Sequence, residues 1–290
     1  MSVVIRLATR GSRQAVTQAE GVRTALAQRG IESELVIVDT HGDRTQAANV
    51  PLHQIGGQGV FTKEVQEAVL DGRADAAVHS AKDLPTERPS HLEIGAIMAR
   101  RSATDALIGS KLDELGEGAT IATGSVRRRA QLAEIRPDLR FIELRGNIET
   151  RLQKIPDGGA VVMAVAALEV LDLTTHIADV LDPAVFIPAV GQGAVAVECR
   201  GDDNTTLEAL RSINDDVTFA SVTVERAYLG ELGVGCSAPV GAHVVGRNLA
   251  AFLGGTETNF RSTVELSGDL ERDVEVARAL AVTARSATGV

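Results

Sequence analysis

A single carboxylate among small polar residues is the feature of this sequence best suited to chemistry. The stretch from Ala76 to Pro85 begins as an apolar run and continues through His79, Ser80, Lys82 and Asp83. This pattern predicts a buried strand that presents polar side chains at its carboxyl end, where open α/β sheets hold their ligands. An ionised Asp83 there could stabilise a developing cation or hold the proton of a leaving amine. The structural alternative is that Asp83 caps a short helical turn with Pro85 near its first position.

Arginines beside Gly or Ser at three expected strand ends form a second group. The group consists of Arg10, Arg145 and the pair Arg127 and Arg128, and Arg151 lies one and a half turns beyond Arg145. A guanidinium can donate two parallel hydrogen bonds to a carboxylate or phosphate. Ser125, which precedes one pair, is a favourable helix N-cap, and the free N–H groups of such a turn attract anions. Taken singly, each of these is more often a solvated surface arginine. Together they predict a crevice that binds several carboxylates or phosphates.

Cys236 lies in the segment Leu232–Gly241, in which Gly233 and Gly235 make a loop where a thiol could be exposed. The alternative is a small buried apolar residue, which is also our expectation for Cys199 inside an apolar strand. Two cysteines cannot form a disulfide scaffold, and their spacing does not predict a metal site. No histidine is close to Cys236 in sequence, so a Cys–His hydrolase has no local support, although a distant partner stays open.

A glycine-rich segment, Gly56 to Phe61, resembles a phosphate-binding loop only loosely. It lacks Gly-Lys-Ser/Thr and does not fit the dinucleotide fingerprint. We expect it to enter a helix as a loop that could close over substrate.

Strands and helices alternate in the first half of the chain, and the pattern restarts near Thr104. The expected strands are 3–8, 35–38, 75–79, 120–123, 139–144, 161–165, 195–199, 242–245, 250–253 and 263–266. The expected helices are 14–29, 61–70, 126–135, 148–154, 167–171, 218–229 and 273–284. Alternation predicts two α/β domains with largely parallel sheets, and strands grouped before a helix predict a small α+β third domain. Gly191 and Gly193 would let the chain return into the first domain.

Composition excludes several classes of protein. The chain has 290 residues, 44% of them hydrophobic, and a formal charge of −10, which argues against a general nucleic-acid binder. Aromatic residues make up 2%, with no Trp, which leaves little for base stacking. We see no signal peptide and no apolar run of the ~18 residues that span a bilayer, so we expect a cytoplasmic enzyme with no membrane partner.

Taken together, these motifs resemble the hydroxymethylbilane synthase family, also called the porphobilinogen deaminase family. The resemblance covers most of the chain, from Ile5 to about His243, with all motifs in one order. They are Ala8-Thr-Arg-Gly-Ser12, Gly56-Gly-Gln-Gly-Val-Phe61, Val78-His-Ser-Ala-Lys-Asp-Leu-Pro85, Ser125-Val-Arg-Arg128, Leu144-Arg-Gly-Asn147, Pro188-Ala-Val-Gly-Gln-Gly193, Val197-Glu-Cys-Arg200, Glu225-Arg226 and Gly235-Cys-Ser-Ala-Pro-Val-Gly241.

The resemblance implies two periplasmic-binding-protein-like α/β domains plus a small α+β C-terminal domain. We place domain 1 at 1–97 and 194–214, domain 2 at 98–193 and domain 3 at 215–290. The implied enzyme is a monomer that joins four porphobilinogen molecules head to tail. Each unit loses ammonia to give an azafulvene-like cation, and water finally releases linear hydroxymethylbilane for haem biosynthesis.

The resemblance also implies the roles of individual residues. Cys236 would hold a dipyrromethane cofactor through a thioether, and Asp83 would be the catalytic carboxylate. The implied cofactor-binding residues are Lys82, Ser12, Thr123, Ser125, Arg127, Arg128, Arg145 and Arg151. The implied substrate-binding residues are Arg10, Ser12, Phe61 and Gln192. No metal is implied.

Some positions depart from the family pattern. Gln54 and Gln58 stand where lysine is common, and Glu169-Val170 stand where many members have a basic residue. Gly124 replaces a commoner serine. We expect substrate affinity or elongation rate to be affected more than the type of reaction.

Two other functions are compatible with parts of the sequence. A non-catalytic two-lobed protein could bind a small polycarboxylate, but such proteins are usually exported and need no loop cysteine. A different transferase could use Cys236 as a nucleophile.

Overall fold

The computed structural model describes residues 4–40, 61–87, 89–234 and 238–290, and the chain divides into two compact units. Unit 1 comprises Met1–Val50, Gly57–Arg101 and Ala194–Ala220. Unit 2 comprises Pro51–Gly56, Ser102–Gly193 and Ser221–Val290. In the described part of the chain, no helix combines the length and the apolar character needed to cross a membrane.

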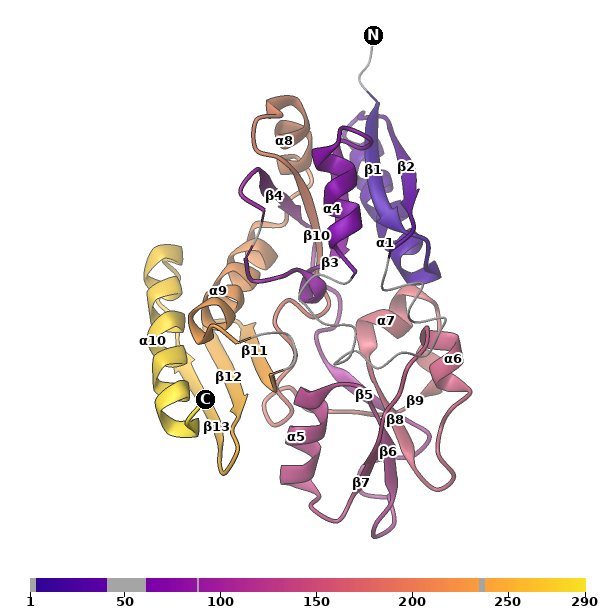
Figure 1. The fold of residues 1–290 in the computed structure, drawn as a ribbon, viewed down its shortest axis with the longest axis vertical. Coiled ribbons are helices and arrows are strands. Elements are labelled where there is room, and N and C mark those ends of the chain that lie inside the picture. Colours follow the sequence, from indigo (N-terminus) through magenta and orange to yellow (C-terminus); the bar gives the residue numbers. More distant parts are fainter. Residues whose placement is uncertain (1–3, 41–60, 88, 235–237) are drawn as a thin grey trace. The chain divides into compact units, whose positions relative to one another are not determined.

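Unit 1 is built on a five-stranded sheet with the order β2-β1-β3-β10-β4 (Figure 1). Its strands are β1 (Ile5–Arg10), β2 (Ser33–Val38), β3 (Ala76–Ser80), β4 (Leu92–Ile97) and β10 (Val195–Arg200). β1 is parallel to β2 and β3, whereas β10 is antiparallel to β3 and β4. The carboxyl ends of the parallel strands therefore share one edge, where α/β sheets hold ligands.

Helices cover both faces of this sheet because successive strand residues point to opposite sides. On one face, α1 (Arg13–Gln28) and α8 (Asn204–Arg211) pack on a core that includes Leu7, Val78 and Val197. On the other, α4 (Lys63–Leu70) packs against a smaller core. The one-turn 3-10 helix η1 (Ala81–Asp83) directly follows β3.

Unit 2 contains a second five-stranded sheet, with the order β7-β6-β8-β5-β9. Its strands are β5 (Asp105–Ile108), β6 (Thr120–Ala122), β7 (Arg140–Ile142), β8 (Ala160–Ala164) and β9 (Ile177–Val180). Its helices are α5 (Val126–Ile135), α6 (Ile148–Leu152), α7 (Val165–Val170) and the 3-10 helix η2 (Thr174–His176). α5 packs on one face, and α6 and α7 contribute to the core of the other.

The two five-stranded sheets have the same order of strand directions, although the two units share no sequence motif. In each, three parallel strands adjoin an antiparallel fourth strand and then a fifth. The fourth strand is β10 in unit 1, which comes late in the chain, and β5 in unit 2, which comes before its neighbours. The second strand of each sheet leads into a helix with a serine N-cap: β1 leads into α1, capped by Ser12, and β6 leads into α5, capped by Ser125.

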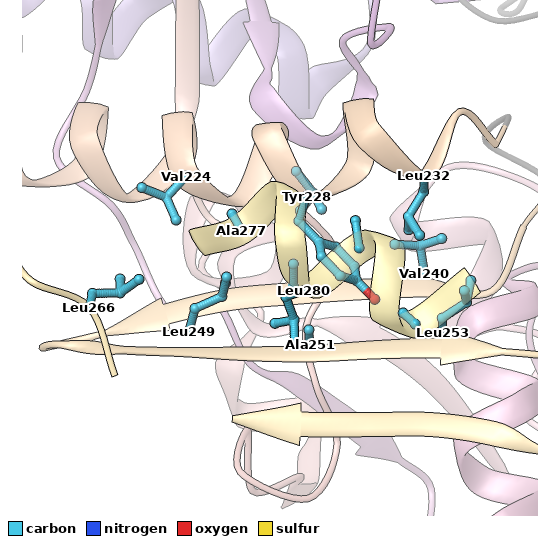
Figure 2. Close-up of a cluster of buried hydrophobic side chains, with 14 residues drawn as sticks. Val224, Tyr228, Leu232, Val240, Leu249, Ala251, Leu253, Leu266, Ala277 and Leu280 are labelled. Carbon is cyan, nitrogen blue, oxygen red and sulfur yellow. The ribbon is translucent and has the colours of Figure 1, made fainter. Parts of the chain in front are cut away.

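A three-stranded antiparallel sheet completes unit 2. Its strands are β11 (Val240–Val245), β12 (Asn248–Gly254) and β13 (Asn259–Glu265), and its helices are α9 (Asp216–Leu232) and α10 (Leu270–Thr288). The boundary between the units falls within α9. Tyr228 of α9, which is fully buried, lies among apolar side chains from β11, β12 and α10 (Figure 2).

The predicted fold class is confirmed: two α/β sheets and a small α+β part appear in the expected order. The division into domains 1–97 with 194–214, 98–193 and 215–290 stays a prediction. Sequence reasoning missed β4, β5, β9 and α8.

Candidate active site

Asp83 is the last residue of η1, and Leu84 follows as the C-cap. It is therefore not the N-cap of a helix, and the capping interpretation is wrong. Its side chain is half-buried and makes no hydrogen bond or ion pair with any residue that the structure describes. A carboxylate held at a strand end, with no partner among these residues, can accept hydrogen bonds from the N–H groups of a ligand and balance a positive charge.

The backbone around Asp83 is fixed by its neighbours. Ser80 Oγ donates to Gln18 Oε1 of α1 at 3.0 Å, and the N–H of Ala81 donates to the carbonyl of Ala194 at 2.9 Å. Lys82, also half-buried, lies within η1. The turn is thus tied to a helix and to the residue preceding β10, which orients the candidate carboxylate.

Arg10 ends β1, as predicted, and its guanidinium stacks on Phe61 with 4.1 Å between Cζ and the ring centroid. Such contact of a cation with an aromatic face is favourable. Ser12 Oγ accepts from the N–H of Ala15 at 3.3 Å and caps α1. These three candidate residues of unit 1 therefore surround the carboxyl end of one parallel strand.

Arg127 and Arg128, at the start of α5, are both buried and share one buried carboxylate. Arg127 Nη2 donates to Asp105 Oδ2 at 2.7 Å, and Arg128 Nη2 donates to Oδ1 at 2.7 Å. Arg128 Nε also donates to Asp105 Oδ1 at 3.0 Å. The Nη1 groups donate to main-chain oxygens, that of Arg127 to Ile187 and that of Arg128 to Val162. Asp105 is 0% exposed. Two guanidinium groups against one carboxylate leave this cluster with an excess positive charge, which favours an anion nearby.

Gln192 extends the same cluster. Its Nε2 donates to the carbonyl of Ala103 at 2.6 Å and to Asp105 Oδ1 at 3.1 Å, and the side chain is 1% exposed. Burial lowers the pKa of Arg127, and the charge of Arg128 lowers it further, whereas Asp105 raises it. The structure thus places Gln192 where it anchors the segment before β10 to the start of β5.

Ser125 caps α5 as predicted, with Oγ accepting from the N–H of Arg128 at 3.4 Å. Thr123 Oγ1 accepts from the N–H of Ser125 at 3.2 Å. Both hydroxyls thus help to form the turn between β6 and α5. Their hydrogens remain able to donate to an anion.

Arg145 differs from the other buried arginines. It is 9% exposed, and neither Nε nor Nη2 has a hydrogen-bond partner among the described residues. Burial lowers the pKa of Arg145, although the carboxylate of Glu143 raises it. Burying guanidinium N–H groups without acceptors is unfavourable, so the described residues leave room for an anion beside Arg145.

The turn after Arg145 requires glycine. Gly146 has φ +121°, and a Cβ there would lie 2.7 Å from Thr150 Cγ2. Asn147 then caps α6, with Oδ1 accepting from the N–H of Thr150 at 2.8 Å, while Arg151 Nε donates to the Gly146 carbonyl at 2.8 Å. Arg151 therefore stabilises the turn that presents Arg145.

Several predicted features lie outside the described residues or have other contacts. Cys236, Gln54 and Gln58 lie outside them. Glu169 Oε2 accepts from the N–H of Ser102 at 3.3 Å, and Val170 is buried. Neither Glu169 nor Val170 supplies a positive charge at the positions where many family members have a basic residue.

Sequence reasoning missed Asp105. The available signal was a charged residue that heads the apolar run Asp105–Ile108. It also gave no role to His79, whose buried imidazole faces Glu198.

Comparison with known sequences gives consistent matches. Residues 5–208 match the family model "Porphobilinogen deaminase, dipyromethane cofactor binding domain", and residues 219–285 match "Porphobilinogen deaminase, C-terminal domain". A porphobilinogen deaminase of Trichlorobacter lovleyi is 44% identical over 82% of this chain and 78% of its own. One of Cutibacterium acnes is 41% identical over 97% and 92%. One of Deinococcus radiodurans is 44% identical over 84% and 82%.

Among solved structures, the chain matches the methionine binding protein MetQ. The TM-score is 0.44 and the identity 15%, over 81% of this chain and 96% of that one. A periplasmic substrate-binding protein from Coxiella burnetii matches with a TM-score of 0.42 and 16% identity, over 77% and 96%.

Proposed function

The chain belongs to the porphobilinogen deaminase family, and we propose that Asp83 is the catalytic carboxylate of its reaction. The family match makes the chain a transferase of hydroxymethylbilane synthase type with a dipyrromethane cofactor. It favours this function over a non-catalytic polycarboxylate-binding protein. The observation that carries the proposal for Asp83 is a strand-end carboxylate without a partner among the described residues.

Asp83 suits the reaction because porphobilinogen becomes cationic when ammonia leaves it. A fixed carboxylate stabilises that charge without reorganising, whereas a carboxylate already paired with arginine would be partly neutralised. Its oxygens can also accept the pyrrole N–H and so orient the ring.

Arg145 is proposed to hold a carboxylate of the cofactor. Its buried guanidinium, with Nε and Nη2 unpartnered among the described residues, fits a group that carries acetate and propionate side chains, because each such carboxylate can accept two parallel hydrogen bonds. When bound, dipyrromethane supplies the nucleophilic pyrrole carbon to which porphobilinogen units are added. Cys236, which lies outside the described residues, is proposed as its covalent anchor.

The remaining candidate residues are proposed as further carboxylate and ring contacts. For the cofactor these are Ser12, Lys82, Thr123, Ser125, Arg127, Arg128 and Arg151. For the substrate they are Arg10, Ser12, Phe61 and Gln192. The excess positive charge of the Arg127–Arg128–Asp105 cluster supports an electrostatic contribution even where its own bonds are internal.

We also propose the three-domain division given above, a cytoplasmic location and a monomeric state. The family match supports porphobilinogen as the substrate. Size-exclusion chromatography with light scattering would test the monomer, and a dimer would contradict it.

Asp83→Asn tests the central assignment. The amide keeps the size of the side chain but not its charge, so turnover should fall at least about 100-fold, a loss typical of removing one electrostatic catalytic group. Cofactor loading, measured by intact mass, and thermal stability should change little. Glu87→Gln is the matched control, because it neutralises an exposed carboxylate on the same segment. Near-normal turnover of Asp83→Asn would refute the role.

A further inference from the structure

A buried polar cluster lies in unit 1, apart from the groups assigned above. Glu198 Oε2 accepts from Gln66 Nε2 at 2.7 Å and lies 3.4 Å from His79 Nε2. The exposed fractions of the three residues are 0% for Glu198, 4% for Gln66 and 5% for His79. The cluster joins β10, α4 and β3.

Strand geometry explains why these side chains meet. β3 and β10 are antiparallel, with Ala196 opposite His79 and Glu198 opposite Ala77. His79 and Glu198 therefore point to the same face of the sheet, the face covered by α4. The rest of that layer is an apolar cluster of Ala8, Val38, Val65, Ala68, Val69, Ala74, Ala77 and Leu92.

Stability alone does not account for a polar cluster in this place. Taking a carboxylate out of water is unfavourable, and well-packed apolar side chains of similar volume commonly serve a core at least as well. The contact with His79 is long, and His79 Nε2 has no hydrogen-bond partner among the described residues. The arrangement is therefore better explained by a positional role than by its contribution to the core.

The cluster lies beside segments that carry candidate catalytic groups. His79 is on β3, which runs into η1 and Asp83. Gln66 is in the first part of α4, the helix that follows Phe61, whose ring stacks on Arg10. A shift of the end of β3 would therefore move Asp83, and a shift of α4 would move Phe61.

We infer that His79, Glu198 and Gln66 are positioning residues that fix the end of β3 relative to α4. They would act on the reaction through Asp83. This inference rests on the proposed role of Asp83. It assigns no contact with substrate to any of the three.

A double-mutant cycle between Glu198→Gln and Asp83→Asn tests it. The rate to measure is the addition of the first porphobilinogen unit to cofactor-loaded enzyme, followed by intact mass. Glu198→Gln removes the charge and keeps the shape, so the rate should fall at least about tenfold when Asp83 is present. With Asn at position 83 the same change should lower the rate less than about twofold, since residues that act through one group are not additive.

Cys199→Ala provides the matched control. Cys199 lies next to Glu198 on β10 but points into the apolar core on the other face. The Cys199→Ala change should lower the melting temperature while leaving the rate of porphobilinogen addition unchanged. A merely structural role of Glu198 would give the same pattern as this control.

Two results would overturn the inference: an unchanged rate in Glu198→Gln, or an equal loss in both backgrounds. Failure of the proposed function is a separate result, because Asp83→Asn alone would then be nearly as active as the wild type. Should Glu198→Gln not fold, His79→Gln removes the other half of the pair, and the same two comparisons decide the question.

Discussion

Arg145 and the pair Arg127–Arg128 are buried arginines of the same unit, but their partners differ. The pair shares Asp105 at 2.7 Å from each guanidinium, whereas Arg145 has no acceptor for Nε or Nη2 among the described residues. A protein that buries a cation normally supplies its counter-charge, because an uncompensated charge is strongly unfavourable. The difference separates two arginines that stabilise the unit from Arg145, for which we propose that a ligand supplies the counter-charge.

The largest effect on stability is expected at Asp105. Asp105→Asn leaves two buried guanidinium groups without a carboxylate, so the free energy of unfolding should fall by about 3–5 kcal/mol. Urea denaturation of the cofactor-loaded protein measures it. Asp113→Asn, an exposed change nearby in sequence, should stay within about 0.5 kcal/mol. A loss at Asp105 no larger than at Asp113 would contradict the comparison.

Arg128→Lys should have an intermediate effect. Lysine keeps the charge but cannot reproduce the bonds from Nε and Nη2 to Asp105 and from Nη1 to Val162. The free energy of unfolding should fall by about 1–3 kcal/mol. The same denaturation experiment checks it, and a loss equal to that of Asp105→Asn would show that geometry matters as much as charge.

Arg145→Leu should change stability least of the three, by less than about 1 kcal/mol or with a gain, because it removes a buried charge whose Nε and Nη2 have no hydrogen-bond partner among the described residues. Cofactor assembly or chain growth, followed by intact mass, should nevertheless be impaired. Arg140→Leu is the control, since Arg140 is an exposed arginine on β7. Unchanged assembly and elongation in Arg145→Leu would remove Arg145 from the site.

Local sequence signals predicted several of the helices and strands and the position of Arg145. The start of α5 at Val126 follows from the N-cap Ser125, and the strand ending before Asp83 follows from its apolar run. Arg145 was identified from its place beside Gly146 at a turn. These are properties of neighbouring residues, which sequence patterns report directly.

Contacts between distant residues could not be predicted in the same way. The pairing of Arg127 with Asp105 joins residues 22 apart and depends on β5, a strand of four residues that sequence reasoning missed. The contact between Gln66 and Glu198 spans 132 residues and depends on β10 returning to the sheet of unit 1. Sequence therefore indicated which groups are polar and well placed, but not which of them already have partners.

The smallest expected effect concerns a buried group of unit 1, the thiol of Cys199. Burial raises the pKa of Cys199 to about 12, with smaller contributions from Asp203 and Glu93. In native Cys236→Ala protein at pH 8, iodoacetamide should therefore leave Cys199 unmodified, because the thiolate is the reactive form. Mass spectrometry measures the labelling, and urea-unfolded protein is the positive control. Rapid labelling of the native protein would show that Cys199 is not the closed core residue described above.

The most direct test of the proposed cofactor site is the intact mass of protein purified from cells that make porphobilinogen. We expect a covalent dipyrrole adduct on the wild type and its loss in Cys236→Ala, with Cys199→Ala retaining the adduct. Wild-type protein that carries no adduct under these conditions, or an adduct that persists in Cys236→Ala, would contradict the proposed cofactor site.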